Sequence, residues 1–110
     1  MEEIVERSLL YDFYGSLLTD HQSRIYRMAV FNDLSLSEIA EAAGISRQAA
    51  SDLLKRVDRQ LEAYEKHLHL VSKFQKIRSD TEQIKALASK KDPDSFSQID
   101  TLADRILGEI

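Results

Sequence analysis

Apolar residues recur at steps of three or four along most of the chain, a spacing typical of helices that bury one face. Polar breaks divide this pattern into segments of helical length. The predicted helices span residues 4–18, 20–31, 36–43, 46–71, 74–87 and 95–106, with a bend or short break near His69–Ser72. The expected fold class is therefore all-α, with five or six helices.

The first predicted helix carries apolar side chains on more than one face, so we expect it to be buried on two sides. Its aromatic residues Tyr11, Phe13 and Tyr14 can either stack on nucleic-acid bases or fill a core. Because the segment around them is acidic, the core is the favoured interpretation.

Three segments have the spacing of a capping box, in which a Ser or Thr and a Gln or Glu three residues later satisfy free backbone N–H groups. The pairs are Thr19 and Gln22, Ser35 and Glu38, and Ser95 and Gln98. Ser46 can cap the helix that follows it. The run 90–94 contains a proline and predicts a stop before the last helix. The apolar face of that helix comprises Phe96, Ile99, Leu102, Ala103 and Ile106.

From Ala50 onward the apolar residues alternate at steps of four and three, as in helices that pack lengthwise on a partner. This seam comprises Leu54, Val57, Leu61, Tyr64, Leu68 and Val71. An unbroken helix over residues 46–71 is ~38 Å long, more than a small domain needs for its own core. The seam is therefore a candidate homodimer surface, and the last two or three helices are expected to form an antiparallel coil.

Residues 36–55 meet the requirements of a helix-turn-helix, in which two short helices cross at a steep angle. The crossing needs a small residue, Ala40, and the turn needs a residue that tolerates positive φ, Gly44. The elbow and the inner faces need apolar residues, and the sequence provides Ile45, Ile39, Ala43, Ala50 and Leu53. The complete pattern favours this motif over a plain helical corner.

The second helix of the motif leaves a polar and basic outer face on the turns that enter the major groove in such proteins. The candidate DNA-binding residues are Ser46, Arg47, Gln48, Ser51, Asp52, Lys55, Arg56 and Arg59. Arg47 suits a guanine edge and Gln48 an adenine edge, and Ser46 with the first free N–H groups can hold a phosphate. The three later cations suit backbone contacts. Asp52 can accept from cytosine or pair with Arg56, and a merely solvated surface is the alternative interpretation of the whole face.

The net charge of −4 is unevenly distributed over the 110 residues. Residues 1–43 sum to −5, residues 44–60 to +2 and residues 61–110 to −1. Because phosphate attraction depends on the local field, the short positive segment makes double-stranded DNA the expected partner. Four phosphate contacts per chain are few, so useful affinity implies a homodimer.

The chain has no cysteine, which excludes disulfides and thiol catalysis. It also carries no motif of a phosphate loop, a catalytic nucleophile or a metal site, so we expect neither enzymatic activity nor a cofactor or bound metal. The start Met1–Arg7 is acidic, which argues against a secretory signal. No apolar run approaches the ~20 residues of a membrane span. The expected location is the cytoplasm, without membrane contact.

Four stretches together resemble the YlxM proteins, a bacterial family of helix-turn-helix proteins. They are LYDFYGSLLTDHQ (10–22), DLSLSEIA (33–40), SRQA (46–49) and LEAYEK (61–66), and the resemblance covers roughly residues 4–75. The Leu-Thr-x-x-Gln start and the motif after it also resemble region 4 of sigma factors, in the winged-helix-type superfamily. The chain is too short for the core-binding regions of a sigma factor. Ala50 and Ser51 depart from the bulky β-branched residue and the aromatic residue that family members tend to carry.

These features predict a helix-turn-helix DNA-binding domain over residues 1–60. A long helix and a C-terminal helical coil over 61–110 would serve oligomerisation or a partner. The resemblance further implies a regulatory role and a link to the signal recognition particle pathway, because the family's genes lie beside those of the particle's GTPases. Two hypotheses result: a DNA-binding regulator, favoured by the complete motif, and a helical interaction module acting on components of that particle. The acidic net charge and the sparse basic face favour the second.

Overall fold

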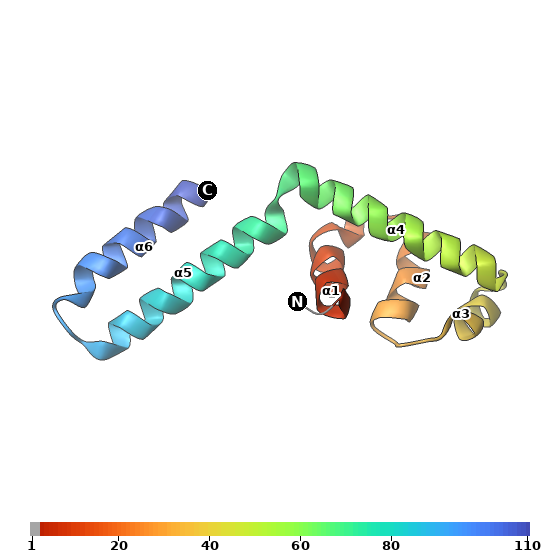
Figure 1. Cartoon of the computed structure of the whole chain (residues 1–110), viewed down its shortest axis with the longest axis horizontal. Coiled ribbons are helices and arrows are strands. Elements are labelled where there is room, and N and C mark those ends of the chain that lie inside the picture. Colours follow the sequence, from red (N-terminus) through yellow and green to blue (C-terminus); the bar gives the residue numbers. More distant parts are fainter. Residues whose placement is uncertain (1–2) are drawn as a thin grey trace. The chain divides into compact units, whose positions relative to one another are not determined.

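The computed structural model describes residues 3–110, and all the regular elements in this range are helices (Figure 1). Met1 and Glu2, part of the acidic start considered above, lie outside the described residues. The elements are α1 (Glu3–Tyr14), a 3-10 turn η1 (Gly15–Leu17), α2 (Asp20–Val30), α3 (Leu36–Ala43), α4 (Arg47–Leu68), α5 (Leu70–Lys90) and α6 (Ser95–Glu109). The all-α prediction is confirmed. Within residues 3–110, no helix is both long enough and apolar enough to cross a membrane.

The chain forms two compact units, Met1–His69 and Leu70–Ile110. The boundary between them falls at the end of α4. The helix ends there because His69 adopts the left-handed conformation (φ 56°), with its N–H bonded to the carbonyl oxygen of Glu65. This confirms the break expected near His69–Ser72. The limit of 60 that the sequence suggested for the first domain falls within α4, which continues to Leu68.

Helix α4 forms one side of the core of the first unit, and α1, α2 and α3 each pack against it (Figure 1). This packing covers the middle of the apolar seam of α4: Leu54 is 8% exposed and Val57 and Leu61 are fully buried, whereas Leu68 is 46% exposed. Contrary to the prediction, these three buried residues are not available as a dimer surface. The apolar spacing correctly predicted that this face of α4 is packed against other helices, and these are α1, α2 and α3 of the same chain.

Two of the three expected capping boxes are present. Thr19 and Gln22 cap α2, and Ser35 and Glu38 cap α3, each with both reciprocal hydrogen bonds. The third prediction is wrong, because Ser95 is the first residue of α6 rather than its N-cap, and it is buried. The helix begins at Ser95, directly after a turn in which the side chain of Asp92 accepts from the N–H of Asp94.

Helix α1 is less buried than expected, since Ile4 and Val5 are 50% and 44% exposed. The helix also ends at Tyr14, and the 3-10 turn η1 takes over at Gly15. The ring of Tyr11 lies 2.9 Å from where a Cβ on Gly15 would stand, so a side chain at position 15 would force this ring to move. The aromatic residues of α1 belong to the core, as predicted: Tyr14 is 1% exposed, and Tyr11 stacks on Tyr26.

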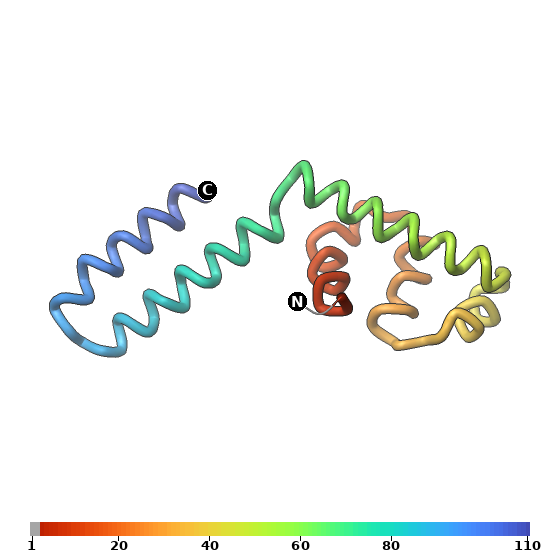
Figure 2. The backbone as a smooth tube through the Cα atoms, viewed as in Figure 1, coloured from red at the N-terminus to blue at the C-terminus, as the bar shows by residue number. Residues whose placement is uncertain are grey.

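The second unit is a hairpin of α5 and α6, which run antiparallel and side by side (Figure 2). The carboxylate of Asp80, on α5, is nearly buried and pairs with Arg105 of α6 at 3.0 Å. Leu102 is buried, but Phe96 is 67% exposed and does not belong to the packed face of α6 as expected. It lies one residue past Ser95, which takes the inward position.

Candidate nucleic-acid interface

The turn between α3 and α4 has the geometry of a helix-turn-helix. Gly44 adopts a left-handed conformation (φ 69°, ψ 34°), and the N–H groups of Gly44 and Ile45 both bond to the carbonyl oxygen of Ala40. These bonds give hydrogen-bond donors to a backbone carbonyl group in the last turn of α3, where the helix itself leaves such groups without partners. A Cβ on Gly44 would meet nothing within 4 Å, so only the backbone conformation favours glycine here.

The inner faces of the motif are closed much as the sequence suggested. Ile39 and Ala40 on α3 are 1% and 8% exposed, and Ala50 on α4 is fully buried. Leu53, which was expected on the inner face, is half-buried, and its neighbour Leu54 lies deeper. Ala43 and Ile45 are also half-buried. The small side chain of Ala50 therefore lies fully inside the packing between α4 and the other helices.

The outer face of α4 is open to solvent. Of the eight predicted DNA-binding residues, seven are exposed: Ser46, Arg47, Gln48, Asp52, Lys55, Arg56 and Arg59. Ser51 is half-buried. Gln48, Asp52, Lys55 and Arg59 follow each other at steps of three and four, which places them on one face of the helix, opposite the core.

The start of α4 is ordered by Ser46, whose Oγ accepts the N–H of Ala49 at 3.0 Å. The hydroxyl proton of Ser46 is not used in that bond and can donate to an anion. The first N–H groups of α4 also point out of the helix start, where the helix dipole favours negative charge. Ser46 thus combines a structural cap with a free donor at the tip of the motif.

Asp52 is bound by a neighbour that the sequence analysis did not propose for it. Its Oδ1 accepts from the amide Nε2 of Gln48 at 2.9 Å, one turn earlier. Among residues 3–110 no ion pair joins Asp52 to Arg56, so the guanidinium of Arg56 remains exposed. This hydrogen bond holds the exposed amide of Gln48 beside the carboxylate of Asp52. A DNA base that accepts from the same amide N–H must displace that carboxylate.

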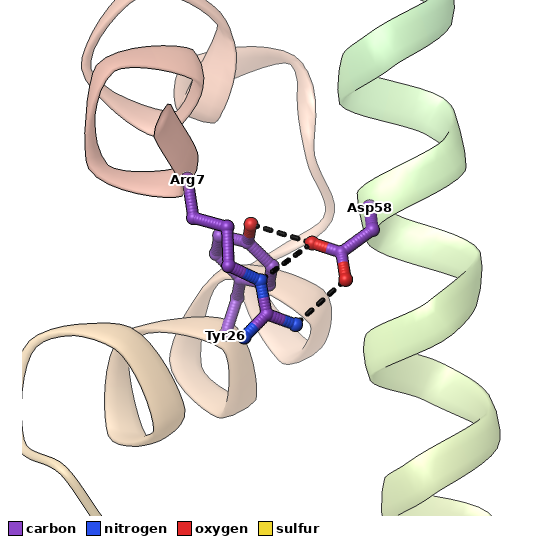
Figure 3. Close-up of polar contacts among 3 residues, drawn as sticks. All are labelled: Arg7, Tyr26 and Asp58. Atoms are coloured by element: carbon purple, nitrogen blue, oxygen red, sulfur yellow. Dashed lines mark hydrogen bonds and ion pairs between the residues drawn. The ribbon is translucent and has the colours of Figure 1, made fainter. Parts of the chain in front are cut away.

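A cluster of three side chains from three helices holds α4 in place (Figure 3). Arg7 of α1 donates from Nε and Nη2 to the two carboxylate oxygens of Asp58 on α4, at 3.0 and 2.6 Å. The hydroxyl of the buried Tyr26, on α2, donates to the same carboxylate at 2.7 Å. The hydrogen bond with Asp58 raises the pKa of Arg7 further, and burial followed by the bond to Asp58 raises the pKa of Tyr26.

This cluster changes the charge of the interface. Asp58 was one of two acids counted against the basic segment, but Arg7 neutralises it, and it is turned toward α1 and α2. Four cations therefore face solvent: Arg47, Lys55, Arg56 and Arg59. Among the eight predicted residues, Asp52 is the one acid that opposes their charge. No sequence pattern indicated the pairing, because Arg7 and Asp58 are 51 residues apart.

Sequence reasoning also missed Arg24 of α2. Its guanidinium reaches the carbonyl oxygen of Ala42 at 3.5 Å, in the last turn of α3 and two residues before Gly44. This places another exposed cation close to the turn of the motif. Only the folded chain brings Arg24 to the end of α3, because no local pattern links positions 24 and 42.

Comparison with known proteins agrees with this geometry. A family model described as "UPF0122: Putative helix-turn-helix protein, YlxM / p13 like" matches residues 1–101. A UPF0122 protein of Caldanaerobacter subterraneus subsp. tengcongensis is 49% identical over 84 residues, covering 76% of this chain and 72% of the relative. UPF0122 proteins of Thermoanaerobacter pseudethanolicus and Clostridium botulinum are 40% and 44% identical, covering 96% and 86% of this chain and 94% and 90% of those proteins.

Proposed function

Because the chain belongs to the UPF0122 family of YlxM / p13-like helix-turn-helix proteins, we propose that it binds double-stranded DNA through α4 and acts as a cytoplasmic regulator. The observation that carries the proposal is the exposed outer face of α4, with Arg47, Lys55 and Arg56 in the N-terminal half of the motif's second helix and Arg59 just beyond it. That end of the second helix enters the major groove in helix-turn-helix complexes.

The roles of the side chains follow from their positions. Arg47, in the first turn, suits a guanine edge, and Gln48 suits adenine once it leaves Asp52. Ser46 and the first N–H groups of α4 suit a phosphate. Lys55, Arg56 and Arg59 lie further along and suit the sugar–phosphate backbone, with Arg24 near the turn as an additional cation. Ser51 is half-buried and contributes less.

Fluorescence anisotropy with a labelled pool of random duplex DNA, over a series of salt concentrations, tests the proposal. We expect binding that weakens as salt rises, with a slope that falls by about 0.9 for each phosphate contact removed. The variant Arg47→Ala, Lys55→Ala, Arg56→Ala should lose most of the binding. The matched variant Lys66→Ala, Lys90→Ala, Lys91→Ala removes the same charge from exposed positions elsewhere and should bind like the wild type.

Equal affinity of the two triple variants would end the proposal, because binding would then depend on total charge and not on the outer face at the start of α4. Selection of bound duplexes from the same pool would identify the preferred sequence. A preferred base that changes when Arg47 is replaced would assign that contact.

A second function is favoured by the acidity of the rest of the first unit, since residues 1–43 sum to −5. In it, the motif is a scaffold and the chain acts on components of the signal recognition particle. Pull-down of the particle's GTPase and its RNA by the full chain tests this. Retention of neither at micromolar protein would contradict it, and retention unaffected by the α4 triple variant would favour it over DNA binding.

A further inference from the structure

The α5–α6 hairpin leaves one of its faces apolar and uncovered. Ser95 and Leu102 on α6 and Asp80 on α5 are buried, so they mark the sides on which the two helices meet. Phe96 and Ala103 each follow one of these α6 residues, ~100° further around the helix. Phe96 and Leu107 are 67% and 69% exposed.

The corresponding side of α5 lies on the same face. Thr81 follows Asp80 by one residue, and Ala88 lies on the same stripe seven residues later; both are exposed. Because α5 and α6 run antiparallel, the same rotation about each axis leads to the same face of the hairpin. The stripe of Phe96, Ala103 and Leu107 therefore lies beside a stripe of small side chains on α5, and together they form a shallow apolar face.

The two outer edges of this face carry opposite charges. On α5 the edge is basic by one charge, because Arg78 pairs with the exposed Glu82 at 3.1 Å and Lys85 adds a further exposed cation; on α6 it is acidic, with Asp100 and Asp104 exposed. The whole helices follow the same division: α5 has five Lys or Arg against two Asp or Glu, and α6 has one against three. The opposite side of α6 carries Gln98, Thr101 and Arg105.

A hairpin this short needs more apolar burial than it has by itself. Between residues 70 and 110, Val71 and Leu102 are the buried apolar side chains, and units well under ~70 residues rarely hold a sufficient core alone. A second layer of helices on the exposed face would supply the missing burial, as in four-helix bundles.

We infer that the apolar face of the α5–α6 hairpin, with its basic and acidic edges, binds a second copy of this chain, α6 of each copy lying against α5 of the other. The opposite charges of the two edges favour a second copy of this chain as the partner, and they also favour one orientation of that copy. A twofold axis parallel to the helices brings Asp100 and Asp104 of one chain to the basic edge of the other, twice. The alternative, with α5 on α5 and α6 on α6, brings like charges together and is disfavoured.

This inference supplies the second chain that the proposed DNA binding requires, but it rests on the hairpin and is tested without DNA. Sedimentation equilibrium of the full chain should give twice the 12.6 kDa of one chain. Reversal of the acidic edge (Asp100→Lys, Asp104→Lys) or of the basic edge (Arg78→Glu, Lys85→Glu) should weaken self-association by about tenfold or more.

An equimolar mixture of the two reversed variants should regain the mass of a dimer, because each acidic edge again meets a basic one. That result also shows that both variants are folded, which helical circular dichroism checks independently. The control variant Gln98→Lys, Thr101→Lys places charge on the opposite face of α6 and should dimerise like the wild type.

Three results would overturn the inference. A wild-type chain that stays monomeric at micromolar concentration would mean that something other than a second copy covers the face. Undiminished association of the acidic-edge variant would favour the like-on-like arrangement. A control variant as weak as the edge variants would place the contact on the other face. None of these results depends on whether the α4 variants bind DNA.

Discussion

Replacement of Asp58 by alanine tests whether the cluster that joins α1, α2 and α4 stabilises the first unit. The change removes three hydrogen bonds, two from Arg7 and one from Tyr26. It leaves the guanidinium of Arg7 half-buried without its carboxylate. It also leaves the hydroxyl of Tyr26, a residue with no exposed surface, without its acceptor.

The expected loss follows from the burial of the partners. The side chains of Arg7 and Asp58 are 24% and 25% exposed, so their pair lies between a surface pair and a buried one. Surface pairs contribute ~0–1 kcal/mol, whereas breaking a buried pair costs ~3–5 kcal/mol. An unsatisfied buried hydroxyl adds ~1–3 kcal/mol. We therefore expect Asp58→Ala to lower the free energy of unfolding by about 2–4 kcal/mol, and Asp58→Asn by less.

Urea unfolding followed by tyrosine fluorescence measures this loss in the relevant unit. The chain has four tyrosines and no tryptophan, and all four tyrosines (Tyr11, Tyr14, Tyr26 and Tyr64) lie in the first unit. The signal is therefore blind to the α5–α6 hairpin. Glu62→Ala, an exposed acid on the same helix, is the matched control and should change the free energy by less than about 0.5 kcal/mol.

A double-mutant cycle decides whether the loss arises from the contact itself. Arg7→Ala and Asp58→Ala should be strongly non-additive, because each removes the same pair. If the two losses simply add, or if Asp58→Ala costs less than about 1 kcal/mol, the reasoning from burial and hydrogen bonding is refuted.

Four further changes are predicted. Gly44→Ala should lower the free energy of unfolding by about 1–2 kcal/mol in the same urea assay, because the left-handed conformation strains any Cβ, and Gly44→Asn should cost less. His69→Gly should raise stability by about 1 kcal/mol for the same reason, measured as a higher Tm by circular dichroism. Burial and the bond to Asp58 raise the pKa of Tyr26, so its contribution to stability is complete below the ordinary pKa of ~10 and should be lost as pH rises above it; Tyr26→Phe should flatten this dependence. The hydrogen bonds from the backbone and side chain of Ser35 lower the pKa of Glu38, so the capping box should weaken as pH falls below the usual range of a glutamate, with faster amide exchange in α3.

The sequence predicted those parts of the fold that local chemistry determines. The starts of α2, α3 and α4 depend on side chains within three residues of each cap, and Gly44 fixes the turn by its own backbone preference. The start of α6 at Ser95 was predicted correctly but its capping box was not, because the preceding turn is held by Asp92 and Pro93 and Ser95 is buried.

Long-range partners were beyond the sequence. The stripe of α4 had the right residues but was assigned to a second chain, because periodicity identifies a buried face without saying what buries it. The outer face of α4 could be listed in advance, whereas the removal of Asp58 from that face by Arg7, and the approach of Arg24 to α3, depend on helices distant in the sequence.

The close approach of Tyr11 to Gly15 ties the two positions together during mutation. A methyl group at position 15 would stand 2.9 Å from the ring, and that ring in turn stacks on Tyr26. Enlarging position 15 first is therefore damaging, whereas the same change after Tyr11 has been shortened no longer meets its ring. The order in which substitutions arise at these two sites decides whether the chain tolerates them, and related sequences are expected to vary there jointly.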